Sequence, residues 1–366
     1  MSKEFDYLIV GAGPFGSTCA YELTKAGKKC LVIDKRNVIG GNCYTENLNG
    51  IHVHKYGAHI FHTNDEKIWN YVNQFAPFRQ YTHNVIANFE GKVFTLPFNM
   101  WTFNQLWGVT NPSDARQMIE KQKWTGPITN LEEQALSMVG KDIYEKLIKG
   151  YTEKQWEKSC KDLPASIIKR LPVRFSWDSN YFNDKFTAMP IGGYTQIFEK
   201  MLKGVVVKLK IDYFEDRDYL NGLAEKVIYT GPIDKFYDYR FGKLEYRSLE
   251  WDTYNLDRDN FQGVPVMNYT DSKTKYTRIL EHKWFDPQGQ TSTIVSYEYP
   301  QRYDGTNEPY YPIRDEKNTS IFLKYESLAE QEEKYIFGGR LARYVYFDMH
   351  QIIAQALKLT NELITF

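Results

Sequence analysis

Residues 6–34 constrain the fold of this chain more than any other stretch. An apolar run at residues 7–10 leads into Gly11-Ala12-Gly13-Pro14-Phe15-Gly16, and a second apolar run at residues 30–33 ends at Asp34. Between them, residues 17–26 have helical spacing and stop at Gly27. A strand, a glycine turn, a helix, a second strand and an acid in this order predict a βαβ unit of the dinucleotide-binding type.

The glycines of this turn are predicted to serve different purposes. Gly11 permits the tight turn, Gly13 lets the backbone approach a pyrophosphate, and Gly16 lets the helix pack closely on the strand. The helix N-terminus would offer free N–H groups and a positive dipole end to the pyrophosphate. Asp34 would accept hydrogen bonds from a ribose hydroxyl. A glycine turn alone is weak evidence, and a purely structural βαβ turn is the alternative.

Composition excludes several classes of partner. Lysine and arginine number 46, as do aspartate and glutamate, so the formal net charge of the 366 residues is zero and no overall field attracts nucleic acid. The four cysteines are scattered without a Cys-x-x-Cys pair, which is typical of a reduced, cytoplasmic protein. We find neither a signal peptide nor a stretch long enough to span a bilayer. We therefore expect a cytoplasmic protein that has no membrane span and binds no nucleic acid.

A second glycine pair decides between two dinucleotide cofactors. Gly40-Gly41-Asn42 follows Asp34 so soon that the loop can pass close to a bound cofactor. Such a pair is common in two-nucleotide flavin folds and rare in simple nicotinamide dehydrogenases, so it favours FAD over NAD. An ordinary glycine turn is the alternative.

Two histidines follow in the sequence Tyr56-Gly57-Ala58-His59-Ile60-Phe61-His62. A metal site would need a third ligand, and none lies nearby at a suitable spacing, so we predict that the chain holds no metal. We interpret His59 and His62 as polar groups near a ring system, and a hydrogen-bonded pair in the core is the alternative.

Periodicity changes along the rest of the chain. Residues 85–89 and 92–96 alternate like strands, whereas residues 100–150 are helical, with breaks at Gly140 and Gly150. Residues 205–211 and 226–230 are predicted to be strands that rejoin the first sheet, and residues 244–299 are strand-like again. Near the end, Gly338-Gly339 precedes a helix that Asp348 and Gln351 are predicted to cap.

The chemistry points to a cofactor enzyme, because the chain has no hydrolase motif. The positive end of the last helix, if placed beside a flavin, would stabilise the anionic reduced ring; a helix that merely packs is the alternative. Arginine can bind phosphate with two donors at once, and tyrosine and tryptophan can wall a pocket. For any single arginine, however, an ordinary surface salt bridge is the favoured interpretation. The candidate groups are Arg170, Arg174, Arg247, Arg278, Arg340 and Arg343, with Tyr151, Trp156, Tyr181, Tyr310, Tyr311 and Tyr346.

Several segments together make the chain resemble the bacterial UDP-galactopyranose mutases along nearly its whole length. The glycine turn and Ile39-Gly40-Gly41-Asn42 are shared with amine-oxidase-like flavoproteins in general. The more specific segments are His54-Lys55-Tyr56-Gly57-Ala58-His59-Ile60-Phe61-His62-Thr63-Asn64, Gly150-Tyr151-Thr152-Glu153-Lys154-Gln155-Trp156, Ile168-Lys169-Arg170, Tyr229-Thr230-Gly231-Pro232-Ile233-Asp234, Leu244-Glu245-Tyr246-Arg247-Ser248-Leu249, Glu308-Pro309-Tyr310-Tyr311-Pro312 and Asp348-Met349-His350-Gln351.

The resemblance implies an α/β protein of three parts. A discontinuous, Rossmann-like FAD-binding domain would comprise residues 1–66, 200–243 and 332–366. A helical subdomain with a mobile substrate lid would comprise residues 97–170. An antiparallel sheet that binds substrate would comprise residues 67–96, 171–199 and 244–331.

The resemblance also implies a redox-neutral isomerisation of UDP-galactopyranose and UDP-galactofuranose. In that family N5 of reduced FAD attacks the anomeric carbon, UDP leaves, and the sugar recloses through a flavin-iminium intermediate before UDP returns. The expected partners are therefore the nucleotide sugar, an external reductant such as NAD(P)H, and a second copy of the chain in a homodimer.

Site residues are carried over from the family one by one. Arg170 and Arg278 would bind the diphosphate and stabilise the leaving group, and His62 would also be catalytic. The residues implied in cofactor binding are Gly11, Gly13, Phe15, Gly16, Asp34, Lys35, Gly41, Asn42, His59, Ile60, Tyr213, Gly231, Gly339, Arg340, Asp348 and Met349. The residues implied in substrate binding are His83, Tyr151, Thr152, Trp156, Arg170, Tyr181, Phe182, Arg247, Asn268, Arg278, Tyr311 and Tyr346.

Two other functions stay open on this evidence. A flavin amine oxidase or desaturase on the same fold would need an apolar substrate tunnel and would consume oxygen or another acceptor. A nucleotide-sugar binding protein without turnover would bind UDP and leave both glycine motifs without a purpose.

Overall fold

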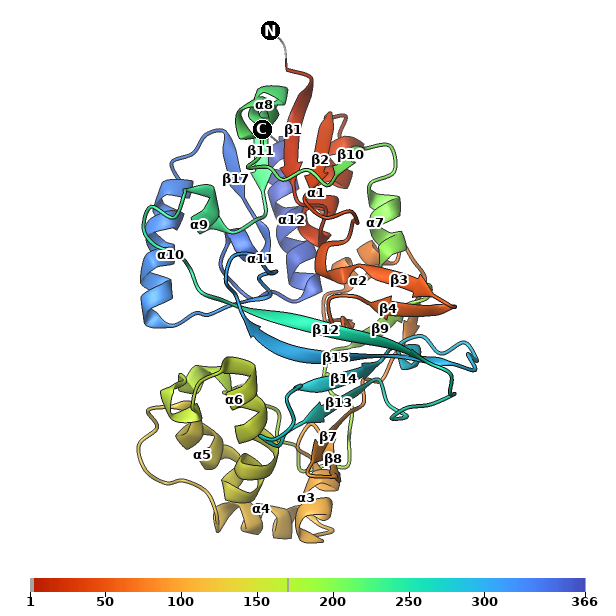
Figure 1. Ribbon diagram of the computed structural model, residues 1–366, viewed down its shortest axis with the longest axis vertical. Helices are drawn as coiled ribbons and strands as arrows, with labels where there is room; N and C mark the ends of the chain where they lie inside the picture. Colours follow the sequence, from red (N-terminus) through yellow and green to blue (C-terminus); the bar gives the residue numbers. More distant parts are fainter. Residues whose placement is uncertain (1–2, 170, 366) are drawn as a thin grey trace. The chain divides into compact units, whose positions relative to one another are not determined.

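The computed structural model describes residues 3–169 and 171–365, so Arg170 lies outside the described residues (Figure 1). The chain forms two compact units. Unit 1 comprises the residues up to Gln80, Asp184–Ser248 and the residues from Tyr303 onward. Unit 2 comprises Tyr81–Asn183 and Leu249–Arg302, and it contains both the helical segment and most of the second sheet. The finer division into three parts stays a prediction.

A five-stranded parallel sheet forms the centre of unit 1, as residues 6–34 predict. Its order is β10-β2-β1-β11-β17, so the strands predicted at residues 205–211 and 226–230 do rejoin it. The bounds are β1 (Phe5–Val10), β2 (Cys30–Asp34), β10 (Val206–Leu209), β11 (Ala224–Tyr229) and β17 (Tyr335–Phe337).

Both faces of this sheet are buried, which is why its strands are nearly continuous apolar runs. Ile9 and Val32 point into one core with α1 (Pro14–Lys25) and α12 (Met349–Thr365), which pack on each other. Leu8 and Leu31 point into the opposite core with Phe236. The helix α1 begins at Pro14, three residues before the predicted start, because proline fits the first helical position.

Smaller elements complete unit 1. One sheet has the order β5-β9-β6, and β3 and β4 form a hairpin. Asp65 caps α2 by accepting hydrogen bonds from the backbone of Lys67 and Ile68. The bounds are β3 (Thr45–Leu48), β4 (Ile51–His54), β5 (Phe61–Thr63), α2 (Glu66–Val72), β6 (Phe78–Gln80), β9 (Phe186–Pro190), α7 (Thr195–Met201), α8 (Arg217–Leu223), α9 (Ile233–Phe236), β16 (Tyr311–Pro312), α10 (Glu316–Ala329) and α11 (Gly339–Ala342), with a short 3-10 turn at Gly41–Cys43.

The sheet of unit 2 has the order β12-β15-β14-β13-β7-β8. It is not wholly antiparallel, because β7 and β13 run parallel. A parallel pair needs a long crossover, and here the helical segment lies between the two strands in sequence. The bounds are β7 (Val85–Phe89), β8 (Lys92–Leu96), β12 (Tyr246–Leu256, whose first residues belong to unit 1 and pair with β16), β13 (Val266–Tyr269), β14 (Arg278–Glu281) and β15 (Thr293–Arg302).

The helical segment of unit 2 follows the predicted breaks in one place and departs from them in another. Gly140, at φ 76°, kinks α5 as expected. Gly150 does not stop a helix, because α6 begins there and continues to Trp156. A Cβ at Gly150 would lie 2.4 Å from the carbonyl oxygen of Thr270, so close packing requires this glycine. The bounds are α3 (Met100–Trp107), α4 (Pro112–Glu120), α5 (Leu131–Ile143), a π-helical turn (Tyr144–Lys149), α6 (Gly150–Trp156), and 3-10 turns at Cys160–Asp162, Ala165–Ile167 and His282–Trp284.

Over residues 3–169 and 171–365, every helix is too short or too polar to cross a bilayer.

Candidate functional site

The glycine turn of unit 1 has the close approaches that its spacing predicts. Gly11 has φ +113°, and a Cβ there would lie 2.0 Å from Oγ1 of Thr230. A Cβ at Gly16 would lie 1.9 Å from the carbonyl oxygen of Gly11, so α1 can pack on the turn only with glycine at this position. At Gly13 the nearest atom to a Cβ is Cα of Gly41 at 3.7 Å, so this position is constrained much less by the protein itself.

The second glycine pair lies directly against this turn. The backbone N–H of Gly40 donates to the carbonyl oxygen of Ala12 at 2.8 Å. Gly41 has φ +55°, and a Cβ there would lie 3.0 Å from Cα of Gly13. The two loops therefore meet at the N-terminus of α1 through Gly13 and Gly41, which have no side chains. Such a cradle of N–H groups suits the pyrophosphate of a dinucleotide, and a Cβ at either glycine would narrow it.

Asp34 ends β2 beside this cradle. Its Oδ2 accepts from the backbone N–H of Ala12 at 2.8 Å, and its Oδ1 accepts from that of Arg36 at 2.9 Å. Because a carboxylate can accept about four hydrogen bonds, these two bonds fix its orientation and leave capacity for a ribose hydroxyl. Arg36 also donates to Asn42 at 2.9 Å, and Lys35 forms an ion pair with Glu308 at 2.9 Å. Sequence reasoning passed over Arg36, which hydrogen-bonds two of the predicted positions, Asp34 and Asn42.

Two residues predicted to bind the cofactor have side chains in the core. The ring of Phe15 is buried, and a Cβ at Gly338 would lie 2.2 Å from its Cζ. Tyr213 is 2% exposed, and its hydroxyl donates to Asn221 at 2.8 Å. Gly231 lies beside the ring of Tyr229, whose hydroxyl would meet a Cβ there at 2.5 Å. Their roles toward a cofactor stay predictions.

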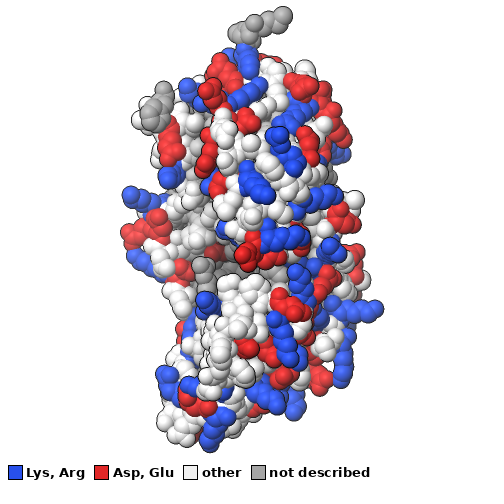
Figure 2. Space-filling model, turned by 90° about the vertical axis from the view of Figure 1, so that its left-hand side faces the viewer, with Lys and Arg blue, Asp and Glu red and all other residues white. Residues whose placement is uncertain are grey.

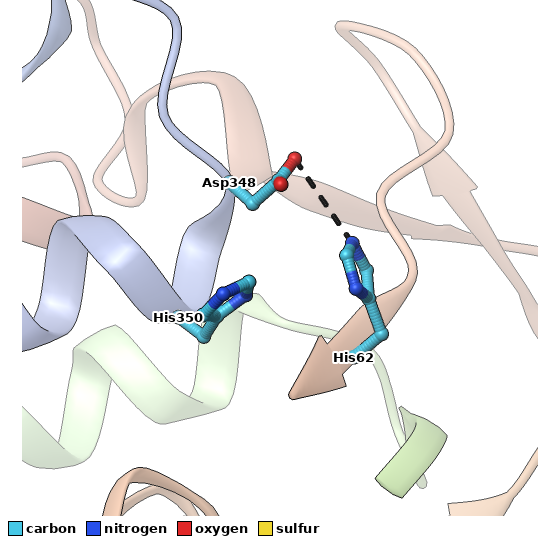
Figure 3. Close-up of side chains that lie close together, drawn as sticks. All are labelled: His62, Asp348 and His350. Atoms are coloured by element: carbon cyan, nitrogen blue, oxygen red, sulfur yellow. Dashed lines mark ion pairs between the residues drawn. The ribbon is translucent and has the colours of Figure 1, made fainter. Parts of the chain in front are cut away.

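His62 lies on β5 beside the start of α12 (Figure 3). Its Nδ1 is 2.8 Å from Oδ2 of Asp184, and its Nε2 is 4.0 Å from Oδ1 of Asp348. The rings of His62 and His350 meet edge to face, with centroids 5.3 Å apart. At the same helix end, the backbone N–H of Asp348 donates to Oε1 of Gln351 at 2.9 Å, which is one half of the predicted capping pair.

Charge and burial shape this cluster. Burial lowers the pKa of His350, and the nearby His62 acts in the same direction, so His350 is neutral at neutral pH. One ligand atom each from His62, Asp348 and His350 lie within 4.8 Å of one another, which is a spacing that could hold a metal ion. The prediction that the chain holds no metal stays a prediction. His59 is turned elsewhere, with Nδ1 2.7 Å from the carbonyl oxygen of Gly57, and Ile60 beside it is buried.

A second polar group of unit 1 surrounds Arg340, which follows Gly339 at φ +82°. Its guanidinium lies 4.5 Å from the ring centroid of Tyr346 and 5.9 Å from that of Tyr311. Tyr311 in turn pairs with Arg247, a buried residue, in the ladder of β12 and β16. The fold therefore brings together Arg340, Tyr346, Tyr311 and Arg247, which are distant in sequence.

Two other arginines have ordinary structural partners. Arg343 forms an ion pair with Glu326 at 3.1 Å. Arg174 donates to the carbonyl oxygen of Asn180 and to Oδ1 of Asn183. For these two arginines, a structural explanation is sufficient.

In unit 2, Arg278 is held by a buried carboxylate. Arg278 and Glu298 pair across β14 and β15, and Nε and Nη2 of the arginine each donate to Oε2 at 2.6 Å. Oε1 of the same glutamate accepts from the hydroxyl of Thr277 at 2.7 Å. The Glu298 side chain is 0% exposed and that of Arg278 is 24% exposed. The guanidinium is therefore fixed in direction before any ligand binds.

Polar and aromatic groups lie around this pair. Asn268 is the partner of Arg278 in the ladder of β13 and β14, and its buried Oδ1 has no hydrogen-bond partner among the described residues. Burial raises the pKa of Tyr181, and the charge of Arg278 opposes this shift, so the two groups lie within electrostatic reach. The ring of His83 contacts both Tyr181 and Phe182, with centroids 5.8 and 5.7 Å away.

The helix α6 carries Tyr151, Thr152 and Trp156, three of the residues predicted to bind substrate. Lys154 fastens this helix to the sheet, because its Nζ donates to the carbonyl oxygens of Tyr269, Thr274 and Tyr276. Burial lowers the pKa of Lys154 to about 8. The helix is thus anchored next to the end of β13, the strand on which Asn268 lies.

Sequence reasoning missed Glu298, Asp184 and His350. A signal for Glu298 was present, since it is a single acid in the otherwise uncharged start of a strand at residues 293–300. Asp184 gave no signal, because it follows no periodic pattern and meets His62 across 122 residues.

On the face drawn in Figure 2, basic and acidic side chains are interspersed, in keeping with the zero net charge.

Comparisons with known proteins agree with this arrangement. The family model described as UDP-galactopyranose mutase matches residues 146–346, and that of the NAD(P)-binding Rossmann-like domain matches residues 9–75. The chain is 43% identical to a probable UDP-galactopyranose mutase of Klebsiella pneumoniae, over 98% of this chain and 94% of that protein. It is 40% identical to a dTDP-fucopyranose mutase of Escherichia coli, over 96% of each.

The fold has a close counterpart among solved structures. A crystal structure of a reduced UDP-galactopyranose mutase superposes with a TM-score of 0.77 at 14% identity, covering 100% of this chain and 94% of the other. An identity of 14% supports a shared fold only. The matching family model and the curated relatives support shared ancestry. This chain belongs to the UDP-galactopyranose mutase family.

Proposed function

We propose that this chain interconverts UDP-galactopyranose and UDP-galactofuranose without net oxidation, using reduced FAD. The observation that carries the proposal is the 43% identity to a probable UDP-galactopyranose mutase, which extends over 98% of the chain. The active-site chemistry of the two units supports it, since one offers a dinucleotide cradle and the other offers an oriented guanidinium.

The residues of unit 1 fit FAD. The glycine cradle at Gly13 and Gly41 and the N-terminus of α1 would bind the pyrophosphate, and Asp34 would bind a ribose. The N-terminus of α12 would stabilise the negative charge of a reduced ring. When bound in the reduced form, the flavin supplies an electron-rich nitrogen nucleophile for the anomeric carbon.

The residues of unit 2 fit the nucleotide. Arg278, together with Arg170 from outside the described residues, would bind the diphosphate and stabilise UDP as it leaves. Glu298 fixes the direction of Arg278, so the cost of ordering that side chain does not fall on the binding step. Uridine and sugar would contact His83, Tyr151, Thr152, Trp156, Tyr181, Phe182 and Asn268, and in unit 1 Arg247, Tyr311 and Tyr346.

Proton movement accompanies the opening and reclosing of a sugar ring. One ring oxygen gains a proton when the ring opens, and another hydroxyl loses one when the ring closes in the alternative size. His62 would hold or pass such a proton at Nε2, because Asp184 already occupies Nδ1.

The test is an assay of purified protein reduced with dithionite. Ring interconversion of UDP-galactose, followed by chromatography of the two isomers, is the expected result. Stoichiometric peroxide from an amine would point instead to an oxidase. A colourless protein that binds UDP but converts nothing would point to a binding protein.

The second candidate substrate is dTDP-fucopyranose, because a mutase of that sugar is 40% identical over 96% of the chain. Its base carries a methyl group, its ribose lacks the 2′-hydroxyl, and its sugar lacks the 6-hydroxyl. Assays of UDP-galactose, dTDP-galactose and dTDP-fucose side by side separate discrimination at the nucleoside from discrimination at the transferred sugar. We expect the highest kcat/KM for the uridine nucleotide.

Three further properties belong to the same proposal. An external donor such as NAD(P)H would reduce the flavin, the enzyme would form a homodimer, and it would work in the cytoplasm. Stopped-flow reduction of the bound flavin by NADH and NADPH tests the first, and sedimentation of the holoenzyme tests the second.

A further inference from the structure

Asp184 holds His62 and Asn64 at the same time. Its Oδ2 accepts from Nδ1 of His62 at 2.8 Å, and its Oδ1 accepts from Nδ2 of Asn64 at 2.6 Å. Oδ1 of Asn64 in turn accepts from the backbone N–H of Lys185 at 2.8 Å. Because both oxygens are engaged from β5 and the residue after it, the carboxylate has one well-defined orientation beside the strand pair β5 and β9.

This contact determines which nitrogen of His62 carries a proton. An ionised carboxylate can only accept, so Nδ1 must be the donor and carry the hydrogen. Nε2 is then the nitrogen that faces the start of α12, 4.0 Å from Oδ1 of Asp348 (Figure 3). That distance falls within the range of an ion pair but is too long for a hydrogen bond.

We propose that Asp184 is a positioning residue for His62, fixing its tautomer and ring orientation so that Nε2 serves the reacting groups. This inference rests on the proposed function. The same division of labour occurs wherever a carboxylate holds a catalytic imidazole by its remote nitrogen. The competing explanation is a purely structural tie between β5 and the start of β9.

The test compares Asp184→Asn with the control Glu66→Gln. Glu66 is a carboxylate on an exposed side chain that forms an ion pair with Lys185 and does not contact His62, so its variant matches the loss of charge nearby. We expect kcat of Asp184→Asn to fall about 10- to 100-fold, with KM changed less than about twofold. Glu66→Gln should keep the wild-type kcat and KM.

A spectroscopic readout separates this inference from the proposed function. Nitrogen-15 NMR of histidine-labelled protein, with the His62 signals assigned from their loss in His62→Gln, reports the tautomer without turnover. Wild-type protein should carry the proton on Nδ1, and Asp184→Asn should shift the population toward Nε2. A wild-type ring protonated on Nε2 alone would overturn the proposal even if the enzyme proves to be a mutase.

A double variant tests whether Asp184 acts through His62. In the His62→Gln background, Asp184→Asn should cause no further loss of kcat, because the group that it positions is gone. An equal loss of kcat in both backgrounds, with equal losses of melting temperature, would show a structural tie and refute the positioning role.

Discussion

Arg278 and Glu298 face each other across the ladder of β14 and β15, and the arginine donates to one carboxylate oxygen through two nitrogens at 2.6 Å each. The glutamate is fully buried, so the guanidinium beside it offsets much of the cost of placing a carboxylate in the core. The pair fixes the direction of a guanidinium whose predicted task is to meet a diphosphate. This relationship leads to two predictions.

Arg278→Ala should lower kcat by at least about 10²- to 10³-fold while FAD stays bound, because it removes the charge that we propose stabilises the leaving diphosphate. Turnover and the flavin absorbance of the purified variant measure the two effects. The alanine also leaves Glu298 uncompensated, so Arg278→Lys is the needed companion. Lysine keeps the positive charge but loses the paired donors of the guanidinium. Arg278→Lys should therefore have a melting temperature close to that of the wild type but a clearly lower kcat. Near-normal turnover in Arg278→Ala would remove the leaving-group role.

Glu298→Gln should lower the free energy of unfolding by about 2 to 4 kcal/mol, because it leaves a guanidinium without its buried counter-charge. Urea denaturation of Arg278→Met, of Glu298→Gln and of the double variant Arg278→Met/Glu298→Gln measures the coupling of the pair. We expect a coupling above about 1 kcal/mol. The exposed pair of Lys273 and Glu90 is the control and should show no measurable coupling. If the losses of unfolding free energy at Arg278 and Glu298 are additive, the two side chains do not stabilise each other.

Local spacing was sufficient to predict the geometry around the glycine turn. The turn, α1 and Asp34 lie within one short stretch, and the position of each follows from a rule about turns, helix ends or strands. The cap of α5 obeys the same kind of rule, since Asn130 accepts from the backbone N–H of Glu133, three residues later, at 3.0 Å.

Rules of local spacing could not predict the tertiary contacts. The helix stop predicted at Gly150 was wrong, because this glycine is there to let the carbonyl of Thr270 approach, 120 positions later. Glu298 could be recognised as a buried acid, but its partner depends on the register of two strands. Asp184 meets His62 only because β5 and β9 are neighbours in a sheet. Pairings of this kind are decided by topology, which single positions do not encode.

Gly13→Ala and Gly16→Ala should fail in different ways. At Gly13 the backbone has φ −78°, and the new Cβ meets Cα of Gly41 at an ordinary 3.7 Å, so the protein should fold normally. The methyl group would instead narrow the pyrophosphate cradle and weaken FAD binding at least about tenfold, or 1.4 kcal/mol. Isothermal titration of the apoprotein with FAD measures this loss. Unchanged affinity would show that the cradle is not the pyrophosphate site.

At Gly16 the new Cβ would lie 1.9 Å from a backbone oxygen, so the free energy of unfolding should fall by about 3 kcal/mol before any cofactor is added. Gly222→Ala in α8 is the matched control, since nothing lies within 4 Å of its Cβ. This control should be neutral or raise the stability by up to about 1 kcal/mol. Equal stability of Gly13→Ala, Gly16→Ala and Gly222→Ala would show that the glycine turn can accommodate a Cβ at Gly16.

Glu308→Gln should lower the stability at neutral pH by roughly 1 to 2 kcal/mol and lose this effect in acid. Burial raises the pKa of Glu308, but the charges of Arg36 and Lys35 outweigh it and hold the pKa below 4.5. The unfolded chain therefore takes up the proton first as the pH falls, so the stabilisation shrinks below about pH 4.5. Urea midpoints from pH 7 to 3 measure it, with the more exposed Glu245→Gln as control. If the difference in stability between Glu308→Gln and the wild type stays constant down to pH 3, that result would contradict a stabilising ion pair at Glu308.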